Sequence, residues 1–362
     1  MTKRNIPPRS EVAATPLDQH GALNFEELTR LGIAPDEIID FSVNSNPWGP
    51  SPVVRKALQK VIIDRYPDRE SLALRTALSK KFGLELSQIM IGNGTSELLW
   101  LVAMAFVHPG DTALTLNPTF GEYARSASLM GAKIESIIAK EQNNFALASE
   151  AVYDALQGTL PRIAFVCNPN NPTGITFAPE IIRNLAKSHP NTLFVIDEAY
   201  IQFVPDLQSC MSLSLPNILV LRSMTKDYGI AGLRLGYAVG QAGMIESLVK
   251  VRSPWNVNAV AQDAGLAALM DDAYLSQTLT RLNAAKGEFL SELQGLGLQP
   301  IPSKTHYFII KVGNAAEFRL RLLVHKIQVR DCASFGLSEY IRVSTKTPAE
   351  NRMFLYALKE IL

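Results

Sequence analysis

The chain has 362 residues, 47% of them apolar, and carries a formal net charge of +1. That length fits two domains, or one large α/β unit with a smaller appendage, and the apolar share is ample for a buried core. Basic and acidic residues are interspersed, so no basic stripe indicates a nucleic acid and no polybasic block indicates a membrane surface.

Along the first part of the chain, helical periodicity gives way to an alternation of β-like runs and helical stretches. Helices are predicted near residues 24–31, 53–61 and 71–82. The alternation that follows predicts a mostly parallel sheet flanked by helices, in which ligands bind at the carboxyl ends of the strands. The predicted strands cover residues 112–116, 133–138, 163–167, 193–196, 218–221 and 235–239.

The pattern changes after Trp255, where residues 260–298 are helical apart from turn breaks. Short strands and helices follow, which indicates a small α+β domain. Its closing helix is predicted over residues 349–362, with Pro348 at the first turn that proline prefers. The intervening predicted elements are a strand at 307–312, a helix at 315–325, and strands at 328–330 and 341–344.

Several features predict a cytoplasmic protein. The longest apolar run, residues 98–107, is too short to span a bilayer and is typical of a buried helix. The first residues contain no apolar core of a secretory signal. Cys167, Cys210 and Cys332 lack metal or redox spacing, so they are interpreted as reduced, buried thiols, and no metal site is expected.

Four short motifs, each after an apolar β-like run, indicate the chemistry. A lysine amine can form a Schiff base with an aldehyde, an acid can keep a pyridine nitrogen protonated, and an arginine with free helix amides can bind a phosphate. Alone, each motif is weak, since Asn-Pro-Thr-Gly is a good turn and a single lysine is usually solvated. Their order is what predicts one site. The motifs are Gly92-Asn93-Gly94-Thr95-Ser96-Glu97, Asn171-Pro172-Thr173-Gly174, Asp197-Glu198-Ala199-Tyr200, and Ser223-Met224-Thr225-Lys226 with Arg234 downstream.

With these motifs the chain resembles the fold type I pyridoxal-phosphate enzymes of the class I/II aminotransferase superfamily, from about residue 20 to the C-terminus. The resemblance implies an α/β fold, with a mostly parallel sheet flanked by helices in a large cofactor-binding domain (46–255). It also implies a smaller α+β domain (256–362), with an N-terminal segment (1–45) packed on it.

The resemblance also implies roles for individual residues. Lys226 would form the Schiff base with pyridoxal 5'-phosphate, and Asp197 would pair with its ring nitrogen. Asn171 and Tyr200 would hydrogen-bond the ring oxygen, Tyr200 counting with Lys226 and Asp197 as catalytic, and Phe120 would stack on the ring. Tyr66 would reach the phosphate in the partner subunit, which implies a homodimer with shared active sites. The implied phosphate ligands within one subunit are Gly94, Thr95, Ser96, Ser223, Thr225 and Arg234.

Within the superfamily two families stand out, the L-threonine O-3-phosphate decarboxylases of cobalamin biosynthesis and the histidinol-phosphate aminotransferases of histidine biosynthesis. The pairs His20-Gly21 and Pro254-Trp255 and the run Asn44-Ser45-Asn46-Pro47 favour the decarboxylases. Tyr200 departs from them, since they can carry phenylalanine there. We therefore expect decarboxylation of L-threonine O-3-phosphate to (R)-1-aminopropan-2-yl phosphate, with amino transfer from histidinol phosphate as the alternative.

Four residues are candidates for substrate binding. Arg330 and Arg342 each lie at or beside a short apolar run and can present a bidentate fork to an anion, although each could also form a surface salt bridge. His20 and Asn44 match positions near the substrate anion in the decarboxylases. The expected ligand is a small phosphorylated amino acid or amino alcohol. Sequence does not distinguish loss of carboxylate from loss of the Cα proton, because sub-ångström orientation decides it.

Two other classes of protein remain as alternatives. A regulatory module could bind the cofactor without chemistry, although Lys226 and Asp197 argue against it. A nicotinamide-dependent dehydrogenase would need Gly-x-Gly-x-x-Gly after its first strand, and the run from Gly92 lacks the third glycine.

Overall fold

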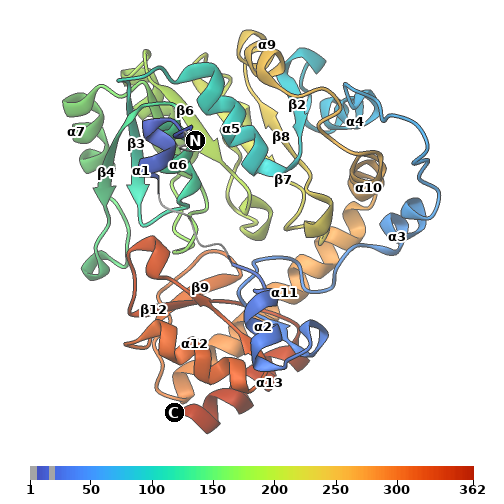
Figure 1. The fold of residues 1–362 in the computed structure, drawn as a ribbon, viewed down its shortest axis with the longest axis vertical. Helices are drawn as coiled ribbons and strands as arrows, with labels where there is room; N and C mark the ends of the chain where they lie inside the picture. The colour runs from blue at the N-terminus through green and yellow to red at the C-terminus, as the bar shows by residue number, and fades with distance from the viewer. Residues whose placement is uncertain (1–5, 16–20) are drawn as a thin grey trace, which may run out of the picture.

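The computed structural model describes residues 6–15 and 21–362. Its main element is a seven-stranded sheet in which all strands run in the same direction except β8, which is antiparallel to its neighbours β2 and β7 (Figure 1). This arrangement confirms the predicted α/β fold. The strand order is β2 (Ile89–Gly92), β8 (Gly236–Val239), β7 (Ile218–Ser223), β6 (Leu193–Asp197), β5 (Ile163–Cys167), β3 (Thr112–Asn117) and β4 (Lys133–Ile138).

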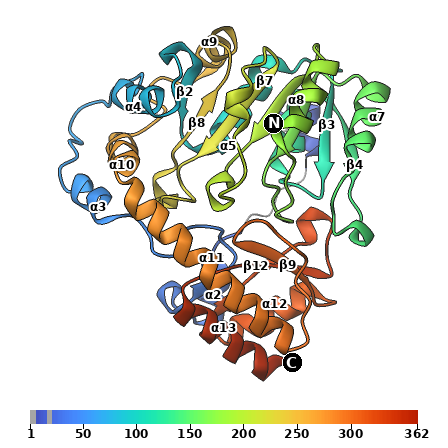
Figure 2. The same cartoon turned by 180° about the vertical axis from the view of Figure 1, so that it is seen from behind.

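Helices bury both faces of this sheet because its strands are apolar on both sides. Along β5, Phe165 and Cys167 belong to one core while Ala164 and Val166 belong to the other, as the two-residue period of a strand requires. The helices of the first core are α5 (Gly94–Phe106), α6 (Glu122–Leu129) and α9 (Ala242–Val251), and those of the second are α7 (Ser149–Thr159) and α8 (Pro179–Ser188). Helix α5 lies over the sheet in Figure 1, and α8 lies over it in the reverse view of Figure 2.

Helix α5 contains the apolar run that was predicted to be buried, and Leu98, Leu99 and Val102 are almost inaccessible to solvent. No helix in the described part of the chain has both the length and the apolarity needed to cross a membrane. A further core lies at the β2 edge of the sheet, where α3 (Pro52–Leu58), α4 (Leu72–Phe82) and α10 (Ala259–Leu269) pack.

A second, three-stranded antiparallel sheet lies beyond the carboxyl ends of the parallel strands (Figure 1). Its order is β11 (Arg330–Asp331), β12 (Tyr340–Ser344) and β9 (Tyr307–Lys311). Phe289, Phe308 and Phe354 join its core, which also includes Phe41 from the N-terminal segment. The helices that cover it are α11 (Asp272–Gly295), α12 (Ala315–Val324) and α13 (Pro348–Ile361).

The N-terminal segment contacts both parts of the molecule. Strand β1 (Ile39–Asp40) pairs in parallel with β10 (Ile327–Gln328), beside the smaller sheet, and α2 (Phe25–Leu31) bonds to α12 through Glu27 and Arg319. Helix α1 (Ser10–Ala14) instead lies near α6, where Arg9 Nη2 donates to the carbonyl of Leu129 at 2.8 Å. The domain limits of the sequence analysis stay predictions.

Two predicted elements are divided in the structure. The helical stretch 260–298 forms α10 and α11, separated where Asp271 accepts a hydrogen bond from the Tyr274 amide at 3.3 Å and caps α11. The predicted strand 328–330 is split at Val329, so that β10 pairs with β1 whereas β11 joins β12. A local cap marks the first division, whereas a partner that lies far away in sequence, β1, decides the second.

Candidate active site

Three of the predicted motifs meet at the carboxyl edge of the large sheet, on the side of the smaller sheet (Figure 1). Asp197 is the last residue of β6, Asn171 lies just beyond β5, and Lys226 lies just beyond β7. The chain just after the N-terminal segment reaches the same place, because the Asn46 amide donates to the Lys226 carbonyl at 2.8 Å. Parallel strands therefore bring together residues that are widely spaced in sequence.

Asp197 is 4% exposed, and each of its carboxylate oxygens accepts a hydrogen bond. The Tyr123 hydroxyl donates to Oδ2 at 2.8 Å, and the Ala199 amide donates to Oδ1 at 3.0 Å. Burial raises the pKa of Asp197, while the two donors and the charge of Lys226 act in the opposite direction. Sequence reasoning missed Tyr123. No local sequence signal marks it, because its partner Asp197 lies 74 residues further along the chain.

Lys226 is half-buried, and its pKa falls from 10.5 to about 8. Burial is the main cause, and the charges of Arg234 and Arg342 add to it, whereas Asp197 opposes the shift. An amine with a lowered pKa is more often neutral near pH 8, and only a neutral amine attacks a carbonyl.

The N-terminus of α5 and the residues at the end of β7, Ser223 to Thr225, form one end of the site. Asn93 at the N-cap makes no side-chain hydrogen bond, so the first helix amides are left without that partner. A Cβ atom added to Gly94, whose φ is +79°, would lie 2.9 Å from Arg234 Nη2. Thus the arginine lies directly against the start of the helix. Across from it, the hydroxyls of Ser223 and Thr225 are 2.7 Å apart.

This arrangement fits the phosphate of the predicted cofactor. Uncapped helix amides, hydroxyls and a guanidinium are the groups that bind phosphate in proteins, and the helix dipole favours the negative charge. The φ of +79° favours glycine at this position, and a Cβ there would displace the Arg234 guanidinium from the start of the helix. Thr95 and Ser96 lie in the first turn of α5, and their role as phosphate ligands stays a prediction.

Aromatic and amide side chains form the middle of the site. The ring of Phe120 meets Tyr123 edge to face, with centroids 5.6 Å apart. Tyr200 is 7% exposed, and burial raises its pKa to about 12, while the charge of Arg342 opposes the shift. Its ring packs edge to face against the ring of Tyr307 in β9, with centroids 4.9 Å apart. Asn171 Oδ1 accepts a hydrogen bond from Arg342 Nη1.

Arg330 and Arg342 lie opposite each other on β11 and β12, so both project from the same part of the smaller sheet. They are 8% and 5% exposed. Arg342 also donates to the carbonyl of Ser42, and among the described residues no carboxylate forms an ion pair with it. Arg330 donates to Ser334 Oγ at 2.6 Å. Burial argues against the alternative that Arg342 forms a surface salt bridge.

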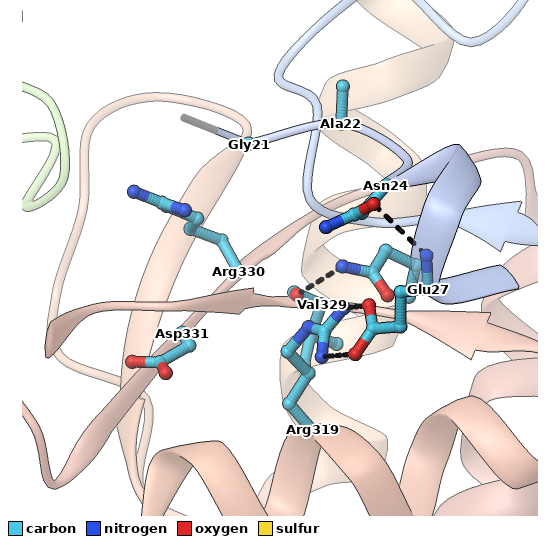
Figure 3. Close-up of a pocket in the computed structure, with 9 residues that line it drawn as sticks. Gly21, Ala22, Asn24, Glu27, Arg319, Val329, Arg330 and Asp331 are labelled. Carbon is cyan, nitrogen blue, oxygen red and sulfur yellow. Dashed lines mark hydrogen bonds and ion pairs between the residues drawn. The ribbon is translucent and has the colours of Figure 1, made fainter. Parts of the chain in front are cut away.

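A pocket of about 410 Å³ adjoins Arg330. In Figure 3, Arg330 extends beside Gly21 and away from the ion pair of Glu27 with Arg319. A Cβ atom on Gly21 would lie 3.0 Å from the Ser42 carbonyl oxygen and 3.6 Å from Arg342 Nη2. The chain therefore passes close to both arginines at Gly21. The described residues that line the pocket are Gly21, Ala22, Asn24, Glu27, Arg319, Gln328, Val329, Arg330 and Asp331.

Asn44 is 1% exposed, and neither polar atom of its amide has a hydrogen-bond partner among the described residues. It lies beside the hydroxyl of Tyr200. Buried amides are nearly always paired, so an amide without a partner of good geometry is a candidate ligand-binding group. Its position agrees with a substrate role, which stays a prediction.

Tyr66, which was predicted to serve the partner subunit, does not join this group. Tyr66 is 76% exposed on the loop between α3 and α4, where its ring stacks on Trp255 with centroids 4.5 Å apart. His20 lies outside the described residues. The three cysteines are buried free thiols, as predicted. Among residues 6–15 and 21–362, no group of three or more His, Cys, Asp or Glu side chains is placed to hold a metal ion.

A family model and a similar protein of known name both identify this chain with the aminotransferases. The family model described as "Aminotransferase class I and II" matches residues 36–358. The chain is 37% identical to histidinol-phosphate aminotransferase 1 of Thiobacillus denitrificans over 347 residues, which cover 93% of this chain and 89% of the relative.

Two solved structures extend the comparison. The L-threonine-O-3-phosphate decarboxylase of Porphyromonas gingivalis is 27% identical with a TM-score of 0.79, covering 89% of this chain and 98% of that one. The histidinol-phosphate aminotransferase of Sinorhizobium meliloti in complex with pyridoxal-5'-phosphate has a TM-score of 0.88 at 24% identity, covering 100% of this chain and 99% of that one. The latter likeness concerns the fold.

Proposed function

Because the chain belongs to the class I and II aminotransferase family, we propose that it transfers the amino group of histidinol phosphate to 2-oxoglutarate, with pyridoxal 5'-phosphate as its cofactor. The observation that carries this proposal is the 37% identity, over 93% of the chain, to a relative named for that reaction. The buried, paired residues Arg330 and Arg342 support it, because the substrate is an anion.

The cofactor's phosphate would be held by the start of α5 together with Ser223, Thr225 and Arg234. When bound, the cofactor supplies an aldehyde that joins an amine and a ring that withdraws electrons from the substrate's Cα. Asp197 would stay ionised beside the ring nitrogen and hold its proton there. Phe120 would cover one face of the ring and exclude water from it.

Lys226 would move the reacting proton. Its Nζ has a pKa of about 8, so near neutral pH the amine exchanges protons without a large energetic penalty in either direction. Tyr200 and Asn171 would donate to the ring oxygen, and Arg342 orients Asn171 through a hydrogen bond to Oδ1. These roles of individual residues are part of the proposal.

The arginines suit both halves of the proposed reaction. Histidinol phosphate has a phosphate and no carboxylate, so Arg330 and Arg342 would bind that phosphate and leave the Cα proton as the group that departs. The acceptor, 2-oxoglutarate, would present its carboxylates to the same guanidinium groups. Bidentate recognition of both oxyanions is the property that distinguishes arginine from lysine.

Decarboxylation of L-threonine O-3-phosphate, the reaction expected from His20-Gly21 and Asn44-Ser45-Asn46-Pro47, has less support. It relies on a structural neighbour at 27% identity, whereas the curated relative at 37% identity is an aminotransferase. These sequence features did not separate two families that share the fold. Decarboxylation is the second candidate function.

The experiment that decides between them is a product assay on the purified holoenzyme. Histidinol phosphate with 2-oxoglutarate should yield glutamate, and O-phosphothreonine alone should release no carbon dioxide. The Lys226→Ala variant serves as the blank for both reactions. Release of carbon dioxide without formation of glutamate would replace the proposal with the decarboxylase.

A further inference from the structure

Tyr123 is a buried side chain for which the proposed reaction has no role. It lies in the first turn of α6 and is 1% exposed. Its ring stacks on Phe165 of β5, with centroids 5.3 Å apart and planes 10° from parallel. The Tyr123 ring also contacts the Phe120 ring edge to face. Packing of this kind leaves the ring one orientation.

The hydroxyl of this ring is directed at Asp197. It donates a hydrogen bond to Oδ2 at 2.8 Å, while the Ala199 amide donates one to Oδ1 at 3.0 Å. With a donor on each oxygen the carboxylate cannot rotate without losing a hydrogen bond in a buried environment, which is costly. The remaining lone pairs of Asp197 are therefore held in fixed directions.

The same hydrogen bond affects the charge of the acid. Burial raises the pKa of Asp197, and the Tyr123 hydroxyl is the largest influence that lowers it, followed by the Ala199 amide and Lys226. Cys167 also lies close, and its thiol stays protonated because burial raises its pKa to about 12. Tyr123 is thus the side chain that most strongly opposes the effect of burial on Asp197.

We propose that Tyr123 is a positioning residue, which orients Asp197 through its hydroxyl and Phe120 through its ring. The inference rests on the proposed function, since it assigns both partners to the cofactor. One side chain would then align the acid at the ring nitrogen with the aromatic that covers the ring face. It acts through these residues without touching the reacting atoms.

The test separates the hydroxyl from the ring. Tyr123→Phe keeps both ring contacts and removes only the donor, so the protein should fold and retain its KM within about threefold. The kcat should fall about ten- to a hundredfold, which is the usual effect of one hydrogen bond to a charged group. Tyr153→Phe, which removes a hydroxyl that accepts from Gln157 at the surface, is the matched control and should leave kcat unchanged.

A double-mutant cycle shows whether the effect passes through Asp197. In an Asp197→Asn background, adding Tyr123→Phe should change kcat by less than about threefold, because the coupled group is already gone. Effects that multiply, or an unchanged kcat in Tyr123→Phe alone, would overturn the proposal.

Binding of the cofactor can be measured without substrate, so it tests the role of Tyr123 independently of which substrate the enzyme uses. The dissociation constant of pyridoxal 5'-phosphate should rise severalfold in Tyr123→Phe, and further in Tyr123→Leu, which also removes the contact with Phe120. That increase should appear whichever substrate the enzyme uses. Equal dissociation constants in all three proteins would refute the positioning role even if histidinol phosphate proves to be the substrate.

Discussion

At the scale of single residues, two side chains of opposite charge shift each other's protonation. Lys226 is driven toward its neutral form by burial and by two arginines, and the charge of Asp197 opposes that shift. Burial of Asp197 favours the protonated acid, and Lys226 opposes that in turn. Each residue therefore depends on the other, and replacing either alters both protonation and chemistry.

Lys226→Ala should abolish turnover, with kcat reduced by several powers of ten, because no other amine in the motif can replace Nζ. Lys226→Arg is the matched control: it keeps a positive charge that cannot act as a nucleophile near neutral pH, and it should be equally inactive. The rate of glutamate formation under saturating substrate is the measurement. Turnover within tenfold of wild type would contradict the role of Lys226.

Asp227, next to Lys226 in sequence, predicts a pH dependence of stability. Burial raises its pKa from 3.8 to about 7. Between these values the folded state binds more protons than the unfolded state, so the free energy of unfolding of wild type falls as pH rises. Asp227→Asn does not titrate, and its Oδ1 can still accept from the Tyr228 amide.

The stability of Asp227→Asn relative to wild type should therefore increase from about pH 4 to pH 7, by at most about 1.4 kcal/mol per pH unit. Urea unfolding of both proteins across this range is the measurement. A constant difference at all pH values would show that the Asp227 carboxyl is not perturbed in the folded state.

At the scale of elements, a loop of the large sheet is clamped onto the smaller sheet. The Tyr307 hydroxyl of β9 donates to the Asn170 carbonyl at 2.9 Å, and the Lys304 amide donates to the Gly174 carbonyl at 3.1 Å. The loop between these contacts carries Asn171. The smaller sheet thus orients Asn171 both through its backbone and, from Arg342, through its side chain.

Gly174→Ala should disturb this clamp. Its φ is +71°, and a Cβ there would lie 1.9 Å from Ser303 Oγ and 2.9 Å from Thr305 Oγ1. We expect a several-fold rise in KM together with a lower melting temperature. Gly158→Ala in α7, where a Cβ has no neighbour within 4 Å, is the control and should be neutral or stabilise slightly. Equal KM values and melting temperatures of the two variants would mean that the contacts of this loop with residues 303–307 are not important for binding or stability.

The elements also show what sequence could and could not predict. The parallel strands were predictable, because β5, β6 and β7 are short apolar runs ended by polar motifs, and that placed Asn171, Asp197 and Lys226 at one edge. The split at Val329 and the role of Tyr123 were not predictable. Each depends on a partner distant in sequence, β1 in one case and Asp197 in the other, and neither partner changes the local pattern.

At the scale of the whole molecule, exposed apolar side chains gather on the loop between α3 and α4. Ile62, Ile63 and Tyr66 are 50%, 80% and 76% exposed, and Trp255, which stacks on Tyr66, is 45% exposed. Exposed apolar groups that contact one another often mark protein interfaces. The homodimer with shared active sites, in which Tyr66 serves the partner subunit, stays our proposal.

Hybrid dimers test it. Tyr66→Phe should impair binding of the cofactor, and Lys226→Ala should be inactive. If Tyr66 serves the partner, a hybrid of the two variants contains one site with both residues intact and one site that lacks both. Mixed and refolded subunits should therefore be more active than either parent. No gain on mixing, or a fully active monomer in sedimentation, would contradict shared sites.

The central claim is that nitrogen passes from histidinol phosphate to 2-oxoglutarate, and labelled substrate tests it most directly. Histidinol phosphate carrying ¹⁵N on its amino group should be incubated with the holoenzyme and unlabelled 2-oxoglutarate, and the products analysed by mass spectrometry. We predict that glutamate acquires the label in proportion to the substrate consumed. Unlabelled glutamate, or consumption of O-phosphothreonine with release of carbon dioxide while histidinol phosphate stays intact, would contradict the account.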